Sequence, residues 1–266
     1  MKTGVAGCGR MGLPMAKALE NAGINTVGFD IRRGNDFNAL PMEFAPDEFA
    51  RDLTTLFTVV RDEAQTDALL FEDQRVLAHA HALEYLVICS TLAPAYIKDI
   101  RKRVPDHIHL VDAPMSGASI AASEARLSFM IGGDQQIIDE LMLHFAAMGN
   151  SFHLMGDLGT GMTAKVLNNL VAAASTTATR TALAWGAQNG LSQKTLLEVM
   201  RKSSGQTWFG SNFEDIEFSK DGYSEDNTIG ILAKDVEAAM TAAPDDASTT
   251  FTKALIETIR ALEPIG

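Results

Sequence analysis

The chain has 266 residues, of which 46% are hydrophobic and 21% charged, a composition typical of a globular protein with a substantial core. Its formal net charge of −12 argues against nucleic acid and against an anionic membrane surface as partners, because both favour a basic face. Two cysteines and six histidines without metal-ligand spacing argue against a disulfide framework or a metal site. The N-terminus has no apolar signal core, and there is no apolar run of about eighteen residues, so we expect a cytoplasmic protein.

The first half of the chain alternates short apolar runs with helical patterns. The apolar runs predict strands at residues 3–6, 26–30, 56–60, 85–89, 108–112 and 127–131. Helices are predicted between them, among others at residues 14–22, 65–70 and 95–104. Such alternation of strands and helices predicts a mainly parallel sheet with helices on both faces.

The second half has a different pattern. Residues 159–190 contain no proline and no strand-like alternation, which predicts one long helix that ends near Asn189-Gly190. Further helices are predicted at 192–202, 227–241 and 248–262. The expected fold is therefore α/β, with a Rossmann-type doubly wound sheet in residues 1–157. An all-helical domain would follow in residues 158–266, joined to the first domain by the long helix.

The first predicted strand leads into a glycine-rich turn, and a helix follows. The turn has the spacing GxGxxG, with glycines at Gly7, Gly9 and Gly12. Glycines so spaced permit a tight turn and a close approach of a pyrophosphate to the helix N-terminus. Asp30 ends the next strand, where a carboxylate can bind both ribose hydroxyls. The combination predicts a dinucleotide site, although Asp30 alone could be only a strand-end cap.

Residues near Asp30 leave the choice of cofactor open. A carboxylate at Asp30 repels a 2′-phosphate and favours NAD, whereas Arg32 or Arg33 could accommodate that phosphate. Both arginines could equally be solvated. We expect NAD as the cofactor, with NADP possible.

The start of the long helix carries the second candidate site. Lys165 and Asn169 are four residues apart, so their side chains lie on one face of the helix. An ammonium and an amide side by side suit a hydroxyl or carbonyl oxygen, because one can exchange a proton while the other fixes the oxygen's position. The alternative is a solvent-facing pair. The next basic residue along this helix is Arg180, and an isolated lysine in such a helix favours the functional interpretation.

Taken together, these segments resemble the β-hydroxyacid dehydrogenase family, which includes 3-hydroxyisobutyrate, tartronate-semialdehyde and 6-phosphogluconate dehydrogenases. Four segments carry the resemblance, in the family's order. They are similar to its cofactor loop (7–16), its substrate loop (112–118), its catalytic segment (156–169) and its late cofactor-side motif (Lys234-Asp235).

The resemblance implies roles for particular residues. Lys165 would be the acid/base, with Asn169 or, second, Asn168 orienting the substrate. The substrate carboxylate would be bound by Ser116, Gly117 and Ala118, and Trp208 would form a specificity wall. The residues implied in cofactor binding are Gly7, Gly9, Arg10, Met11, Gly12, Asp30, Val60, Arg61, Thr91 and Lys234.

Other interpretations and departures from the family pattern stay open here. Ser116-Gly117 could be only a turn, Trp208 a core residue and Lys234-Asp235 a surface pair. Ala118 replaces the second glycine of the family's substrate loop, and the chain ends at Gly266, before the family's usual tail. Arg61 and Arg126 stand where the family has other residues, and could recharge the site or be exposed.

The resemblance implies hydride transfer between a nicotinamide cofactor and a small β-hydroxy acid, a carboxylate substrate. Two alternatives are a non-catalytic dinucleotide-binding scaffold and an imine reductase on the same fold. The long helix is apolar, and members of the family usually pair through the helical domain. Both points predict a homodimer or homotetramer.

Overall fold

The computed structural model describes residues 1–33 and 40–265. The chain divides into two compact units, Met1–Lys165 and Val166–Gly266. The predicted division at residues 157 and 158 stays a prediction.

The first unit is built on one sheet, with nine strands among the described residues. In spatial order they are β3 (Met42–Glu43), β2 (Thr26–Phe29), β1 (Lys2–Ala6), β4 (Leu53–Thr58), β5 (Tyr85–Ile88), β6 (His109–Asp112), β8 (Leu127–Gly132) and β7 (Met115–Ser116), with β9 (Gly149–Gly156) beside β8. The strands from β3 to β6 are parallel, and β8 pairs antiparallel with β6. The order reverses between β1 and β4, the position where such sheets open a crevice at the strands' carboxyl ends.

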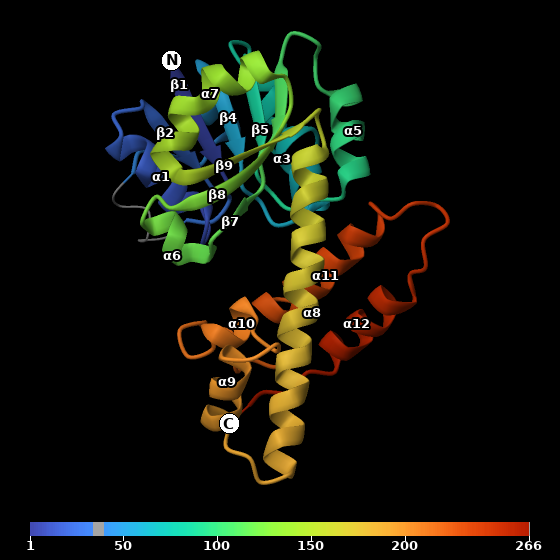
Figure 1. The fold of residues 1–266 in the computed structure, drawn as a ribbon. Coiled ribbons are helices and arrows are strands. Elements are labelled where there is room, and N and C mark those ends of the chain that lie inside the picture. The colour runs from blue at the N-terminus through green and yellow to red at the C-terminus, as the bar shows by residue number, and fades with distance from the viewer. Residues whose placement is uncertain (34–39, 266) are drawn as a thin grey trace. The chain divides into compact units, whose positions relative to one another are not determined.

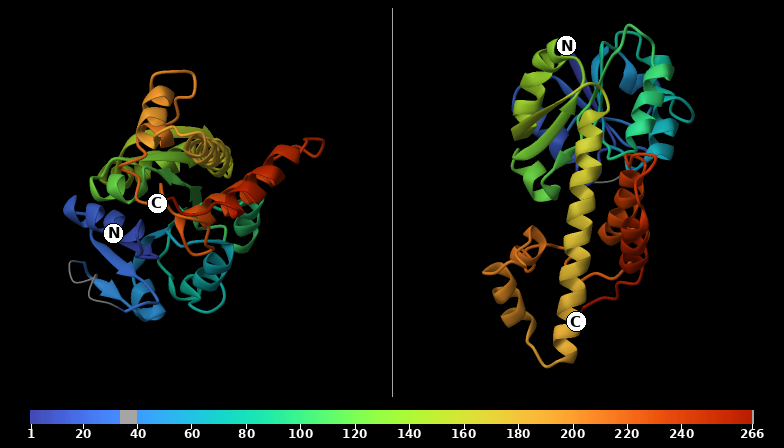
Figure 2. Two further views of the ribbon diagram at one scale, coloured as in Figure 1. Left: turned by 90° about the horizontal axis from the view of Figure 1, so that it is seen from below. Right: turned by 45° about the vertical axis from the view of Figure 1, so that its right-hand side comes forward.

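Helices cover both faces of this sheet (Figures 1 and 2). One face packs against α1 (Gly12–Asn21) and α7 (Gln135–Met148), next to α6 (Ala118–Ser123). The other face packs against α2 (Pro46–Ala50), α3 (Glu63–Leu70), α4 (Val76–His79) and α5 (Pro94–Arg103).

The two hydrophobic cores follow from the alternation of side chains along each strand. On β1, Val5 enters the core beneath α1 and α7, whereas Ala6 enters the opposite core. On β4, Phe57 and Leu56 divide in the same way. Both residues of each pair are fully buried, because a central parallel strand has no solvent-facing side.

The second unit consists of helices joined by loops over residues 166–265. The long helix α8 (Thr160–Gln188) starts in the first unit and continues into the second, where α9 (Gln193–Arg201), α10 (Trp208–Ser211), α11 (Thr228–Met240) and α12 (Thr250–Arg260) follow. Arg180 of α8 is only 2% exposed, and its guanidinium donates to the carbonyls of Ser219, Asp221 and Glu263 over 2.6–2.8 Å. This buried cation therefore joins α8 to two loop segments of the unit.

The fold class predicted from the sequence is confirmed. The predicted strand at 56–60 overlaps β4, which begins earlier, at Leu53, because Leu53 and Thr55 are also buried and pair with β1. β4 ends at Thr58, so residues 59 and 60 lie outside it. The short elements β3, β7, α2, α4, α6 and α10, the helix α7 and the strand β9 were not predicted individually. β9 pairs only with β8, so local sequence pattern alone could not place it.

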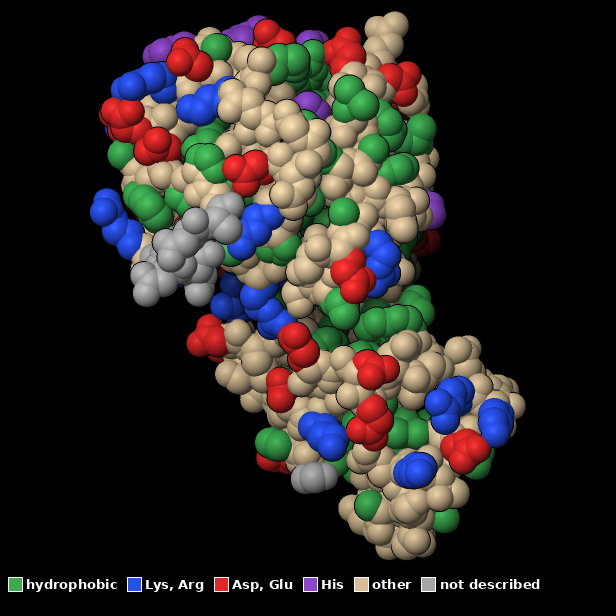
Figure 3. Space-filling model, turned by 90° about the vertical axis from the view of Figure 1, so that its left-hand side faces the viewer, with side chains coloured by type: hydrophobic (Ala, Val, Ile, Leu, Met, Phe, Trp, Pro, Cys, Tyr) green, Lys and Arg blue, Asp and Glu red, His purple; other side chains and the backbone are tan. Residues whose placement is uncertain are grey.

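Charged side chains of both signs are scattered over the face in Figure 3, without one continuous basic patch on it. Within the described part of the chain, no helix combines the length and the hydropathy that crossing a membrane requires.

Candidate active site

The glycine-rich turn after β1 is as tight as its spacing predicts. Gly7 has a φ of +92°, and a Cβ on it would lie 2.6 Å from the carbonyl oxygen of Val59. A Cβ on Gly12, the first residue of α1, would lie 2.1 Å from the carbonyl oxygen of Gly7. Neither position can hold a side chain without moving backbone, so these two glycines are needed for the turn itself.

Gly9 differs from the other two glycines of the motif. A Cβ there would meet only the flexible Arg32 side chain, at 3.4 Å, and the backbone has no positive φ. The turn therefore needs no glycine at this position for its own packing, which is consistent with a glycine kept for close approach of a ligand. Helix α1 has no acidic residue in its first turn, so no carboxylate competes there with an anion. These residues fit a dinucleotide pyrophosphate.

Asp30 and Arg32, predicted to favour different cofactors, form an ion pair. Asp30 Oδ1 accepts from the Arg32 backbone N–H and Nε, both at 2.9 Å, and Oδ2 accepts from Nη2 at 3.0 Å. The Asp30 side chain is buried and that of Arg32 is largely exposed. Their hydrogen bond raises the pKa of Arg32. The carboxylate is thus held rigidly at the end of β2, with a positive charge beside it.

Segments after β4 and β5 complete the carboxyl edge of the sheet. The Val60 side chain borders Gly7, and the Arg61 N–H donates to Gln65 at 3.1 Å, which places both predicted residues in the turn before α3. Thr91 is half-buried in the loop between β5 and α5. The next residue, Leu92, donates its N–H to Met162 Sδ at 3.2 Å, which ties this loop to the start of α8.

The predicted substrate loop follows β6. Ser116 ends β7, paired with Ser128 of β8, and Gly117 and Ala118 lead into α6 with φ values of +136° and +55°. Ala118 therefore adopts a left-handed conformation that favours glycine, the residue common at this place in the family. Arg126, whose role was left open, forms an ion pair with Glu124 and is half exposed.

The start of α8 is held by a residue to which the sequence assigned no role. Asp112, fully buried at the end of β6, accepts hydrogen bonds from the N–H groups of Gly159 at 2.7 Å and Met162 at 2.5 Å. Lys165 follows on the same helix and is only 7% exposed. The alternative of a solvent-facing lysine is therefore wrong.

The second unit brings together three predicted residues in one cluster. Asn169 donates from Nδ2 to Asp235 Oδ2 at 2.6 Å, and Lys234 Nζ lies 3.2 Å from Asp235 Oδ1. Asn168, at the exposed side of α8, donates to Asn169 Oδ1 at 3.2 Å. Asp235 is 3% exposed, so Lys234-Asp235 is not a surface pair. The buried carboxylate orients the amide of Asn169.

Trp208 lies on a different helix of the second unit. It begins α10 and is 63% exposed, so the alternative of a core tryptophan is wrong. An exposed indole can form a wall against a ligand, whereas a core residue cannot.

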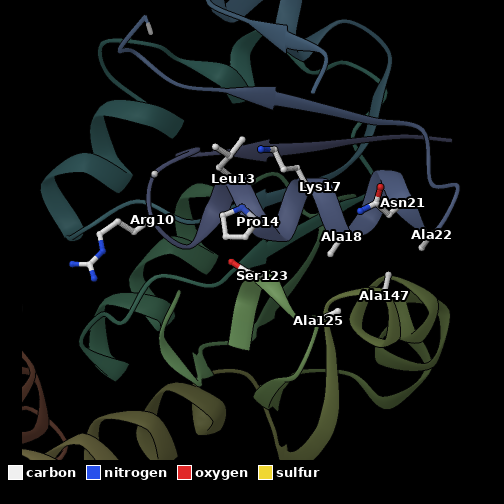
Figure 4. A pocket seen from close by; sticks show the side chains of 11 residues that line it. Arg10, Leu13, Pro14, Lys17, Ala18, Asn21, Ala22, Ser123, Ala125 and Ala147 are labelled. Atoms are coloured by element: carbon white, nitrogen blue, oxygen red, sulfur yellow. The ribbon is translucent and has the colours of Figure 1, made fainter. Parts of the chain in front are cut away.

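A groove of about 660 Å³ runs along the outer side of α1 (Figure 4). Arg10 lies at one end and Ala147 at the other, next to Ala22, and Gly9 also lines the groove. The other predicted site residues do not line it, so the groove meets the predicted site only at the glycine-rich turn.

Two family models cover almost the whole chain. Residues 2–156 match the NAD-binding domain of 6-phosphogluconate dehydrogenase, and residues 159–263 match the NAD-binding model of NADP-dependent 3-hydroxyisobutyrate dehydrogenase. The chain belongs to the β-hydroxyacid dehydrogenase family. The family predicted from the sequence motifs is thus confirmed, and with it a nicotinamide cofactor, NAD or NADP.

Individual members of the family align with most of this chain. An NAD-dependent L-serine dehydrogenase of Pseudomonas aeruginosa is 32% identical over 256 residues, 92% of this chain and 86% of the relative. The mitochondrial 3-hydroxyisobutyrate dehydrogenase of Rattus norvegicus is 27% identical over 96% of this chain and 78% of its own length. The crystal structure of a 3-hydroxyisobutyrate dehydrogenase from Salmonella typhimurium has the same fold, with a TM-score of 0.84 at 21% identity, over 98% of this chain and 93% of the other.

Proposed function

We propose that this member of the family oxidises a small β-hydroxy acid with NAD, or reduces the corresponding carbonyl acid, with Lys165 as the general acid/base. The observation that carries the proposal is a lysine buried to 7% exposure on a helix whose start is hydrogen-bonded to the carboxyl edge of the sheet. A buried lysine needs a reason other than solubility, because removing an amine from water costs free energy.

The cofactor would be bound along that edge by Gly7, Gly9, Arg10, Met11 and Gly12, with Asp30 on the adenosine ribose. Val60, Arg61 and Thr91 would lie near the nicotinamide end, and Lys234 would be a further cofactor-binding residue. We favour NAD over NADP because the Asp30 carboxylate is fixed at the end of β2 and would repel a 2′-phosphate. When bound, the nicotinamide supplies the carbon that accepts or donates the hydride.

The protein's own groups manage the proton and the orientation of the substrate. The neutral amine of Lys165 takes the hydroxyl proton as the alcohol is oxidised. In the opposite direction its ammonium donates a proton to the developing alkoxide. Asn169 holds the same oxygen, and its amide is oriented by Asp235.

The substrate carboxylate would be bound by Ser116, Gly117 and Ala118 through N–H and hydroxyl donors, and Trp208 would limit the substituent beside it. Hydroxy acids of the class named by the relatives, L-serine and 3-hydroxyisobutyrate, fit a site built for a carboxylate and a hydroxyl.

We further propose a cytoplasmic homodimer or homotetramer. Several large apolar side chains of α8 are exposed in the isolated chain, among them Leu167, Val171 and Trp185. Apolar residues exposed along one helix commonly mark an interface with another protein chain.

Initial rates of NAD and NADP reduction over a panel of β-hydroxy acids test the proposal. The panel contains 3-hydroxyisobutyrate, L-serine, glycerate, threonate and 3-hydroxypropionate. We expect turnover of at least one acid, faster with NAD. Tight cofactor binding without turnover of any acid would instead favour the scaffold, and reduction of cyclic imines would favour the imine reductase.

A further inference from the structure

Asp112 joins two segments of the proposed site that lie far apart in the sequence. It is the last residue of β6, and Ser116 of the substrate loop follows four positions later. Its two carboxylate oxygens accept from two different N–H groups at the start of α8, Gly159 and Met162. Gly159 directly precedes α8 and Met162 lies in its first turn, where backbone N–H groups have no partner within the helix. Asp112 therefore acts as a helix cap supplied from a distant strand.

The start of α8 packs closely against the ends of β6 and β8. A Cβ on Gly132, which pairs with Asp112 across the sheet, would lie 2.5 Å from Asp112 Oδ1. A Cβ on Gly161 would lie 2.4 Å from the Met130 carbonyl oxygen and 3.0 Å from that of Asp112. Glycine at both positions lets the start of α8 lie directly on the backbone of β6 and β8.

The first turn of α8 has no acidic side chain that could cap its own N–H groups. Asp112 therefore places at the helix N-terminus a carboxylate that the helix itself does not supply. Burial raises the pKa of Asp112 to about 6, against the opposing effect of its backbone hydrogen bonds. Burial of this carboxylate therefore carries a desolvation cost, which the hydrogen bonds from the two backbone N–H groups offset in part.

We propose that Asp112 is a positioning residue that holds the start of α8, and with it Lys165, at the carboxyl end of β6 beside the substrate loop. The inference rests on the proposed function, because Asp112 would affect catalysis only through the position of Lys165. Lys165 lies three residues after Met162, less than one helical turn from the bonded N–H group. A shift of the helix start would therefore move the amine relative to the substrate loop.

The test compares Asp112→Asn with Asp134→Asn. Asn keeps the shape of the side chain but offers one acceptor and one donor to two N–H groups. Asp134 is a matched control: it caps α7 in the same unit, accepting from the Gln136 N–H at 2.8 Å, and lies on the surface. Asp112→Ser, which keeps a single small acceptor, is the second variant.

Steady-state kinetics and amide exchange give independent readouts. We expect Asp112→Asn to lower kcat about 10²-fold, as misplacement of a catalytic group by about 1 Å can do, with the Kd for NADH nearly unchanged. The limb of the kcat pH profile that Lys165→Ala abolishes should shift in Asp112→Asn and stay in place in Asp134→Asn. Hydrogen exchange at Gly159 and Met162 should be slow in the wild type and fast in Asp112→Asn only.

The outcomes separate the two proposals. If Lys165→Ala loses turnover while Asp112→Asn keeps it, the positioning role is wrong and the proposed function stands. If Lys165→Ala keeps turnover, Lys165 is not the acid/base and both proposals fail. Equal losses of kcat in Asp112→Asn and Asp134→Asn would also overturn the positioning role. Should neither Asp112 variant fold, rapid exchange at Gly159 and Met162 in the wild type would still refute it.

Discussion

Asn169 donates its side-chain amide to Asp235 over 2.6 Å, and the carboxylate that accepts this bond is buried. The amide of Asn169 has a fixed orientation, because one N–H of Nδ2 donates to Asp235 and Oδ1 accepts from Asn168. An amide fixed in this way can use the second N–H of Nδ2 as a donor to the substrate oxygen whose proton Lys165 would exchange.

We therefore predict that Asp235→Asn lowers kcat/KM about tenfold, since the new amide no longer dictates which end of Asn169 it meets. Asn169→Ala should cause a similar loss. In a double-mutant cycle the two losses should not add, because they remove the same interaction. Fully additive losses would show that Asp235 acts on activity independently of Asn169.

The ion pair at the end of β2 predicts cofactor preference. Asp30→Ser removes the charge that repels a 2′-phosphate and releases Arg32 to bind one. The ratio of kcat/KM for NADP to that for NAD should rise about tenfold, which corresponds to about 1.4 kcal/mol. The exposed Asp73→Ser is the control and should leave the ratio unchanged. No change in Asp30→Ser would place Asp30 outside the ribose site.

Replacement of the buried Arg180 should lower the stability of the fold, because the residue bonds to the backbone and has no proposed role in catalysis. Its guanidinium donates to three backbone carbonyls, and a lysine cannot reach all three. Arg180→Lys should lower the free energy of unfolding by about 3 kcal/mol, the order expected for charged hydrogen bonds lost in a buried site. Arg260→Lys alters an exposed pair with Glu237 and should cost less than about 1 kcal/mol in the same urea titration. Equal effects would contradict the role given to Arg180.

The left-handed backbone at Ala118 predicts a stabilising substitution. Ala118→Gly should raise the free energy of unfolding by roughly 1 kcal/mol, because glycine lacks the Cβ that makes this conformation costly. Ala187→Gly, on the exposed face of α8, should instead lower it by about 0.5–1 kcal/mol. Thermal melts of both variants measure the difference, and a loss at both positions would contradict the strain.

His144 predicts a pH-dependent loss of stability. Burial lowers the pKa of His144 from its ordinary 6.5, so the folded chain holds it neutral while the unfolded chain protonates it first. Its contribution to stability is therefore full above pH 6.5 and is lost progressively as the pH falls through the lowered value. The free energy of unfolding of His144→Asn should fall less steeply than that of the wild type below pH 6.5. Parallel curves would contradict this account.

Local patterns in the sequence were sufficient to predict the main elements and to select the candidate site residues. Gly7, Gly9 and Gly12 lie within one turn, and Lys165 and Asn169 lie on one helix, so their spacing alone indicates a shared surface. The boundaries of β1, α5 and α8 agree with prediction to within about one or two residues, the usual uncertainty of such ends.

Tertiary partners could not be predicted in this way. Asp112 reaches the start of α8 across 47 positions of sequence, and Asp235 reaches Asn169 across 66. No periodicity connects residues so far apart, since their contact depends on the packing of whole elements. The pairing of Asp30 with Arg32 is short in sequence, yet the side chains could have pointed apart, and only the structure shows that they bond.

The most direct test of the central claim is turnover by Lys165→Ala. With the best acid of the panel and saturating NAD, we predict a kcat at least about 10²-fold below the wild type, with NADH binding and melting temperature nearly unchanged. Lys194→Ala, at an exposed position on α9, should match the wild type. A Lys165→Ala variant that turns over as fast as Lys194→Ala would contradict the claim that Lys165 is the acid/base.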